Sequence, residues 1–226
     1  MTISTSHLTR AAGLFAVASG LLYIIIQFVH PAENAATVTT SAWAVVGYMT
    51  ELMAVFGMIG VTGIYLRQVT ASGILGLVGF VLFWCFYLLT AAFNFAETLI
   101  MPPLAAQAPQ FVDGFEGVFA GAASQVDLGS LPAISPIAAV LYVLGGALFG
   151  LAIFRARVLD RWAGALLSVG AVLTLVVPLL PHAIGRFAAI PVGLAMAWLG
   201  YSLWSVERRT ISSPGADPRH DLTTAT

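Results

Sequence analysis

One carboxyl, Glu51, lies in the middle of a long apolar stretch of residues, 43–66. At about 1.5 Å of rise per residue, Glu51 falls about 12 Å from the start of the helix that this stretch predicts, near the centre of a bilayer. A charge at that depth is costly and marks a candidate functional residue. We expect Glu51 to donate and accept a proton, as a catalytic acid or within a binding site. The alternative is a structural role, in which its carboxyl bonds a neighbouring tyrosine or backbone carbonyl and holds helices together.

Polar residues recur at helical spacing on two other apolar stretches. One face of the helix expected at 73–101 carries Tyr87, Thr90, Asn94 and Glu97. One face of the helix expected at 11–29 leads to Tyr23, Gln27 and His30. Tyr48 lies one turn before Glu51, and His182 and Arg186 follow the fifth stretch. We therefore predict a polar funnel with Glu51 and two of the tyrosines, Tyr23 and Tyr87, at its floor and the other binding residues along its walls and rim.

Few kinds of chemistry are open to these residues. Glu97 lies roughly 13 Å from the level of Glu51 by helix rise, too far for the paired carboxylates of glycosidases or aspartic proteases. His30, His182 and Glu97 share the rim but lack the close spacing of metal ligands, so we expect neither a metal nor another cofactor. All nine basic residues are Arg, which excludes a lysine Schiff base or a lysine nucleophile. The chain also lacks a G-x-S-x-G elbow and a nucleotide-binding loop.

The composition is that of a polytopic membrane protein. Hydrophobic residues make up 59% of the 226 residues and charged residues only 8%, whereas soluble domains carry about 25% charged residues. The mean hydropathy is +0.95. The formal net charge of −1 excludes a basic surface for nucleic acid, and the single Cys85 excludes an internal disulfide. The partner that we expect is therefore the lipid bilayer.

Six stretches are long and apolar enough for membrane helices, at 11–29, 43–66, 73–101, 132–154, 162–181 and 187–205. Every arginine except Arg186 falls in alternate segments between them, which must share one side of the membrane. By the positive-inside rule we expect both termini of a plasma-membrane protein to be cytoplasmic. Residues 1–209 then form a six-helix domain, and 210–226 a disordered cytoplasmic tail. The alternative for the first stretch, a cleaved secretory signal, is disfavoured because the apolar core is longer than in signal peptides.

Glycines recur every three residues in the second and third stretches, as Gly57, Gly60, Gly63 and Gly73, Gly76, Gly79. Folding at the short turn between these stretches brings Gly60 level with Gly79, which predicts a close, glycine-rich hairpin. The fourth and fifth stretches predict a second such hairpin, through Gly145, Gly146, Gly150, Gly164 and Gly170. Helices held together at the inner end are free to separate at the other, so we expect the funnel to open outward. The same glycine faces are candidates for a homodimer contact.

The long outer connection, 102–131, is itself amphipathic. Its apolar residues Phe111, Val112, Phe115, Val118 and Phe119 fall on one side of a helix, and Asp113 and Glu116 on the other. The pattern predicts a short helix, either a lid over the funnel or a helix resting on the outer leaflet.

Two short segments carry a family resemblance. Leu8-Thr9-Arg10-Ala11-Ala12-Gly13-Leu14 leads to His30-Pro31, and Arg161-Trp162-Ala163-Gly164 opens the fifth stretch. In these segments the chain resembles small bacterial six-helix multi-pass membrane proteins of uncharacterised family. The resemblance implies no activity.

These features favour a protein that binds or moves a small lipophilic or cationic molecule, with Glu51 as the protonatable group. The alternative is a membrane-embedded acid–base enzyme whose lipid substrate, such as an isoprenoid, is cyclised or isomerised by a deep acid among aromatic rings. That chemistry resembles the chemistry of integral membrane terpene cyclases. A third class is an accessory subunit whose glycine faces bind a partner.

Overall fold

The computed structural model describes residues 4–179 and 186–212, and within these ranges every regular element is a helix. The long helices are α1 (Thr5–Val29), α2 (Ser41–Arg67), α3 (Val69–Phe95), α6 (Ile134–Ala156), α7 (Arg161–Leu173) and α9 (Ile190–Ser212). The short elements are the π-helical turn η1 (Ala96–Ile100), α4 (Met101–Leu104), α5 (Pro109–Glu116) and the 3-10 turns η2 (Leu131–Ala133), η3 (Thr174–Leu179) and η4 (Arg186–Ala189).

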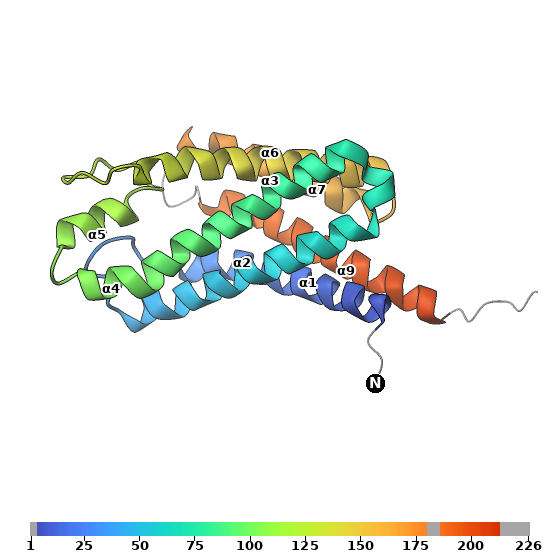
Figure 1. Ribbon diagram of the computed structural model, residues 1–226, viewed down its shortest axis with the longest axis horizontal. Coiled ribbons are helices and arrows are strands. Elements are labelled where there is room, and N and C mark those ends of the chain that lie inside the picture. The colour runs from blue at the N-terminus through green and yellow to red at the C-terminus, as the bar shows by residue number, and fades with distance from the viewer. Residues whose placement is uncertain (1–3, 180–185, 213–226) are drawn as a thin grey trace, which may run out of the picture.

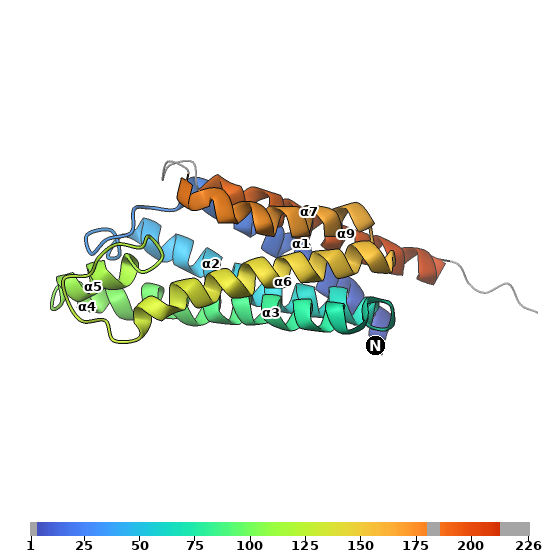
Figure 2. The same ribbon diagram turned by 90° about the horizontal axis from the view of Figure 1, so that it is seen from above.

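The long helices form an elongated bundle (Figures 1 and 2). Helices that follow one another pack together from α1 to α3 and from α6 through α7 to α9, and the pairs α3–α6 and α1–α9 close the ring. The start of α1, the α2–α3 and α6–α7 turns and the end of α9 lie at one end of the bundle, which we call the terminal end (Figure 1). The opposite end, which we call the cap end, carries α4 and α5.

Five helical segments of the described chain are long and apolar enough to cross a membrane: Thr5–Val29, Ser41–Arg67, Val69–Leu104, Leu131–Ala156 and Arg186–Val206. The protein is therefore all-α and of the membrane-embedded type. The stretch expected at 162–181 differs, because its α-helix ends at Leu173 and continues as a 3-10 turn. Pro178 explains this end, since proline has no backbone N–H to donate to the carbonyl four residues earlier.

The predicted pairing of Gly60 with Gly79 across the α2–α3 hairpin is wrong. A β-carbon added to Gly60 would lie 2.7 Å from Ala16 of α1, and one added to Gly79 would lie 2.3 Å from the backbone of Phe149 in α6. Each of these helices has two main neighbours, and the glycines of α2 are divided between them, since Gly57 faces the ring of Tyr87 in α3. Adjacency in sequence does not reveal which neighbour a glycine faces.

In two other helix pairs, glycines do meet across the contact. In the α6–α7 hairpin, as expected, a β-carbon added to Gly150 would lie 2.4 Å from the carbonyl oxygen of Gly164. Between α1 and α9, a β-carbon added to Gly13 would lie 2.8 Å from the carbonyl oxygen of Gly200. These close backbone approaches bring the first and last long helices together and complete the ring.

Residues 102–131, which we call the cap, fold back onto the cap end of the bundle. The ring of Phe115 in α5 stacks on that of Phe93 in α3, with centroids 4.5 Å apart. The carboxylate of Asp113 accepts a hydrogen bond of 2.6 Å from the backbone N–H of Ala35, in the α1–α2 connection. The cap is thus packed on the protein itself and shares a small apolar core with Trp43 and Phe93 of the bundle.

Candidate functional site

Two adjoining cavities lie in the cap half of the bundle. The acidic cavity has a volume of about 270 Å³, and the polar residues that line it are His30, Glu33, Thr50, Thr90, Asn94, Glu97 and Glu116. The apolar cavity has a volume of about 380 Å³ and includes Tyr23, Tyr142, Val143, Leu175 and Ala188 in its lining. Phe86, Phe119 and Ala138 line both cavities, so the two are direct neighbours.

Glu97 belongs to the π-helical turn that ends the long α3 segment. The backbone N–H of Met101 bonds the carbonyl of Ala96, five residues back, where a regular α-helix would bond four residues back. The indole N–H of Trp43 donates to the carbonyl of Glu97 at 3.1 Å and ties this turn to the first turn of α2. Such turns occur frequently at functional sites, and this one presents Glu97 to the acidic cavity.

Glu116 brings a second carboxyl into the acidic cavity, from the end of α5. The residue is only 1% exposed, and neither carboxylate oxygen has a hydrogen-bond partner of good geometry among the described residues. Burial, followed by the negative charges of Glu33 and Asp113, raises the pKa of Glu116 to about 8, although contact with Glu97 opposes the rise. Its amphipathic spacing predicts a place on the polar side of the helix, and in the structure that place faces the cavity rather than water.

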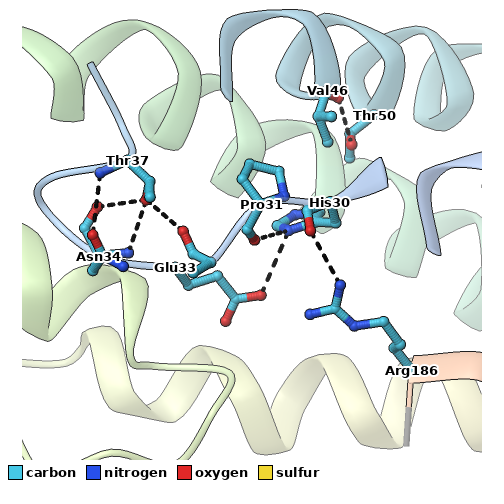
Figure 3. Close-up of polar contacts among 9 residues, drawn as sticks. His30, Pro31, Glu33, Asn34, Thr37, Val46, Thr50 and Arg186 are labelled. Atoms are coloured by element: carbon cyan, nitrogen blue, oxygen red, sulfur yellow. Dashed lines mark hydrogen bonds and ion pairs between the residues drawn. The ribbon is translucent and has the colours of Figure 1, made fainter. Parts of the chain in front are cut away.

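His30, Glu33 and Arg186 meet at the edge of the acidic cavity (Figure 3). The Arg186 guanidinium donates from Nη1 to the backbone carbonyl of His30 at 3.2 Å. The Glu33 carboxylate lies 3.9 Å from Nδ1 of His30, and the same nitrogen bonds the carbonyl oxygen of Pro31 at 2.9 Å. Within the described part of the chain, no acid of this cavity forms an ion pair with an arginine.

Glu51 does not line either cavity, but it bonds a residue that does. The side-chain nitrogen Nδ2 of Asn94 donates to Oε2 of Glu51 at 3.0 Å and to the carbonyl of Gly47 at 2.9 Å. Asn94 is buried and lines the acidic cavity. The contact is of the kind expected from the structural alternative, with an asparagine as the partner. A proton-carrying role for Glu51 stays a prediction.

Of the two tyrosines expected at the funnel floor, only Tyr23 lines one of these cavities. Tyr23 extends from α1 into the apolar cavity, near the buried hydroxyl of Tyr142 on α6, which has no hydrogen bond of good geometry with the described residues. Tyr87 is buried instead between helices. Its ring fills the space beside Gly57, where an added β-carbon would lie 2.4 Å from the ring.

Three further predicted residues do not join the cavities. Gln27 donates to the carbonyl of Tyr23 in its own helix at 3.0 Å. Tyr48 is 55% exposed on the outside of α2, and His182 lies outside the described residues. The structure thus brings together His30, Thr90, Asn94 and Glu97, with Tyr23 next door and Arg186 at the edge.

Glu33, Thr50, Glu116, Phe119 and Tyr142 are among the lining residues that the sequence did not identify as part of the site. Tyr142 had a usable signal, because it is the only tyrosine in the apolar stretch 132–154. No sequence pattern identified Glu116 as a lining residue, since only the folded cap shows which side of α5 faces the bundle.

The described residues contain no group of three or more His, Cys, Asp or Glu side chains arranged to hold a metal ion. No protein-family model, curated protein or solved structure gives a significant match to the chain. Fold and cavities define an all-α protein of the membrane-embedded type, with an acidic space beside an apolar, aromatic one. That combination suits a molecule with a positive charge on an apolar body.

Proposed function

We propose that the protein spans the plasma membrane six times, with both termini in the cytoplasm, and binds or moves a small lipophilic cation. The proposed site opens to the outer face and consists of the acidic cavity and the apolar cavity together. The observation that carries the proposal is the direct contact of these two spaces through Phe86, Phe119 and Ala138. The charge of the ligand would lie among the glutamates, and its apolar body against the aromatic rings.

The electrostatics of the acidic cavity favour a cation over a neutral or anionic ligand. Glu33, Glu97 and Glu116 supply three carboxyls, while Arg186 is directed at a backbone carbonyl. Two like charges about 4 Å apart repel by about 4 kcal/mol at an effective dielectric constant of about 20, and a cation between them removes that repulsion. Aromatic faces add about 0.5–2 kcal/mol of cation–π attraction.

The path of the chain supports six crossings. Together, α7 and η3 cover about 30 Å by helix rise, comparable to the hydrocarbon thickness of a bilayer. The distribution of arginines supports the orientation, since Arg10, Arg67 and Arg155 belong to the terminal end and Arg186 to the cap end.

In this proposal Glu51 is a positioning residue, and the acids that meet the ligand are Glu97 and Glu116. Glu51 acts through its hydrogen bond to Asn94, whose side chain lines the acidic cavity. This differs from a site centred on Glu51 itself, and the two arrangements make different predictions for a Glu51→Gln variant.

Binding of two matched probes tests the proposal. Tetraphenylphosphonium and tetraphenylborate have nearly the same size and apolar surface but opposite charge. We expect the purified full-length protein in detergent to bind radiolabelled tetraphenylphosphonium saturably and tetraphenylborate only by non-saturable partitioning. Equal binding of both ions, or of neither, would contradict a cation site.

One observation favours a second candidate, a membrane-embedded acid–base enzyme acting on an isoprenoid lipid. The raised pKa of Glu116 keeps its carboxyl mostly protonated at pH 7, and the acidic cavity that it lines adjoins an aromatic one. Conversion of an added isoprenoid lipid by the wild-type protein and not by Glu116→Gln, followed by mass spectrometry, would favour this candidate.

The glycine faces contact helices of the same chain, so a homodimer or an accessory role through them is not part of the proposal.

A further inference from the structure

Glu97 and Glu116 both line the acidic cavity, and each carboxyl affects the ionisation of the other. Glu116 is 1% exposed, and its two oxygens lack hydrogen-bond partners of good geometry among the described residues. Two carboxylates that interact in this way do not both ionise readily, because their repulsion is poorly screened away from water. We therefore expect the pair to hold one proton when no other cation is present.

We propose that a lipophilic cation enters the acidic cavity in exchange for the proton held by Glu97 and Glu116. The inference rests on the proposed function and describes how that same site is charged. Before binding, the pair carries one proton and a net charge of −1. After binding, the proton has left to the outer solution, the pair carries −2, and the cation restores the total to −1.

The surroundings of the pair offer no other counter-charge in direct contact. The other charged or titratable groups of the described residues near the cavity are His30, Glu33, Asp113, Arg186 and Glu51, which bonds the cavity-lining Asn94. Arg186 bonds the carbonyl of His30, and Asp113 bonds the backbone N–H of Ala35. Glu33 adds a further negative charge, which strengthens the demand for a cation.

Exchange makes the affinity depend on pH in a defined direction. Below the pKa of Glu116, about 8, each bound cation releases close to one proton, so its Kd falls about tenfold for each unit that the pH rises. As the pH rises past the range in which the pair holds its proton, less proton is released and the dependence of the Kd on pH weakens.

Tetraphenylphosphonium is the probe of choice because it has no titratable proton, so any proton released must come from the protein. Calorimetric titration of the full-length protein at pH 7, in two buffers of different ionisation enthalpy, counts the protons released. We expect about one proton per bound cation at pH 7, and clearly less at pH 9. Glu116→Gln should bind the probe without releasing a proton and should lose the pH dependence.

Asp127→Asn is the matched control. It removes one carboxylate from the same cap, at an exposed turn where Oδ1 accepts a hydrogen bond of 2.8 Å from the backbone N–H of Gly129. Asparagine keeps that oxygen, so the turn should persist and proton release should match the wild type.

Each outcome decides a different point. Binding by the wild type without proton release overturns the exchange and leaves the cation site standing. Absence of probe binding overturns both proposals. Proton release that persists in both Glu116→Gln and Glu97→Gln overturns the assignment to this pair. If Glu116→Gln does not fold, the number of protons released by the wild type and by Glu97→Gln still tests the exchange.

Discussion

Asn94 and Glu51 are joined by a hydrogen bond of 3.0 Å from the amide nitrogen Nδ2 to the carboxylate oxygen Oε2. The same nitrogen donates to the carbonyl of Gly47 at 2.9 Å, so both of its hydrogens are directed at α2. The deep acid of α2 thereby orients a buried residue of α3 that lines the acidic cavity. Because Glu51 bonds Asn94, substitutions at Glu51 can distinguish a structural role from direct contact with the ligand.

Glu51→Gln should change stability and tetraphenylphosphonium binding little, because glutamine keeps an acceptor oxygen for Asn94. Glu51→Ala should lower the free energy of unfolding by about 1–3 kcal/mol, because it leaves a buried donor without its partner. Thermal unfolding in detergent and probe binding measure the two effects. Loss of binding in Glu51→Gln at unchanged stability would instead make Glu51 the acid that meets the ligand.

The raised pKa of Glu116 makes stability depend on pH. The pKa is about 8 in the folded protein and about 4.3 in an unfolded chain, so between these values the folded state holds a proton that the unfolded state releases. The free energy of unfolding is then highest below about pH 4.3 and falls as the pH rises to about 8. Unfolding monitored by tryptophan fluorescence should show this fall in the wild type and in Asp127→Asn, and a flatter profile in Glu116→Gln. An equal fall in Glu116→Gln would assign the effect to other groups.

Gly79→Ala tests the helix pairing. Because the new β-carbon would lie 2.3 Å from the backbone of Phe149, α3 and α6 must separate, and we expect a loss of about 1–3 kcal/mol in the free energy of unfolding. Ala92→Leu is the control, since it enlarges an exposed position of the same helix. Equal stability of Gly79→Ala and the wild type would refute the close α3–α6 contact.

The orientation can be tested with single cysteines. Cys85 is the one native cysteine, so a Cys85→Ala background allows one label to be placed at a time. In intact cells, a membrane-impermeant maleimide should label Asp127→Cys, in the cap, and should label Thr5→Cys, at the start of α1, only after lysis. The reverse pattern would place the termini outside.

Much of the fold follows from hydrophobic length alone. The stretch expected at 43–66 is α2, Ser41–Arg67, and the stretch expected at 132–154 is α6, Ile134–Ala156. Apolar runs of this length leave the chain few other ways to satisfy its backbone in a membrane. The glycine contacts were less predictable, because spacing marks a face of a helix without identifying the helix that meets it.

The part of the site that lies on a single helix face could be predicted from the sequence. Thr90, Asn94 and Glu97 share a face of the α3 segment, and the structure keeps them in one cavity. Glu116 depends on how the cap folds over the bundle, a long-range relationship that no local pattern contains. Tyr48 has suitable spacing, yet it lies with the exposed Val45 and Leu52 on the outward face of α2.

The π-helical turn at Ala96–Ile100 also affects how this chain should be aligned with relatives. A π-helical turn is equivalent to one residue inserted into an α-helix. A homologue with a regular helix here would need a one-residue gap near Glu97. Without that gap, every residue beyond this point would be aligned with one that is rotated by about 100° around the helix. An acid that occupies the same point in space would then stand one place away in a gapless alignment, where it would look like a substitution.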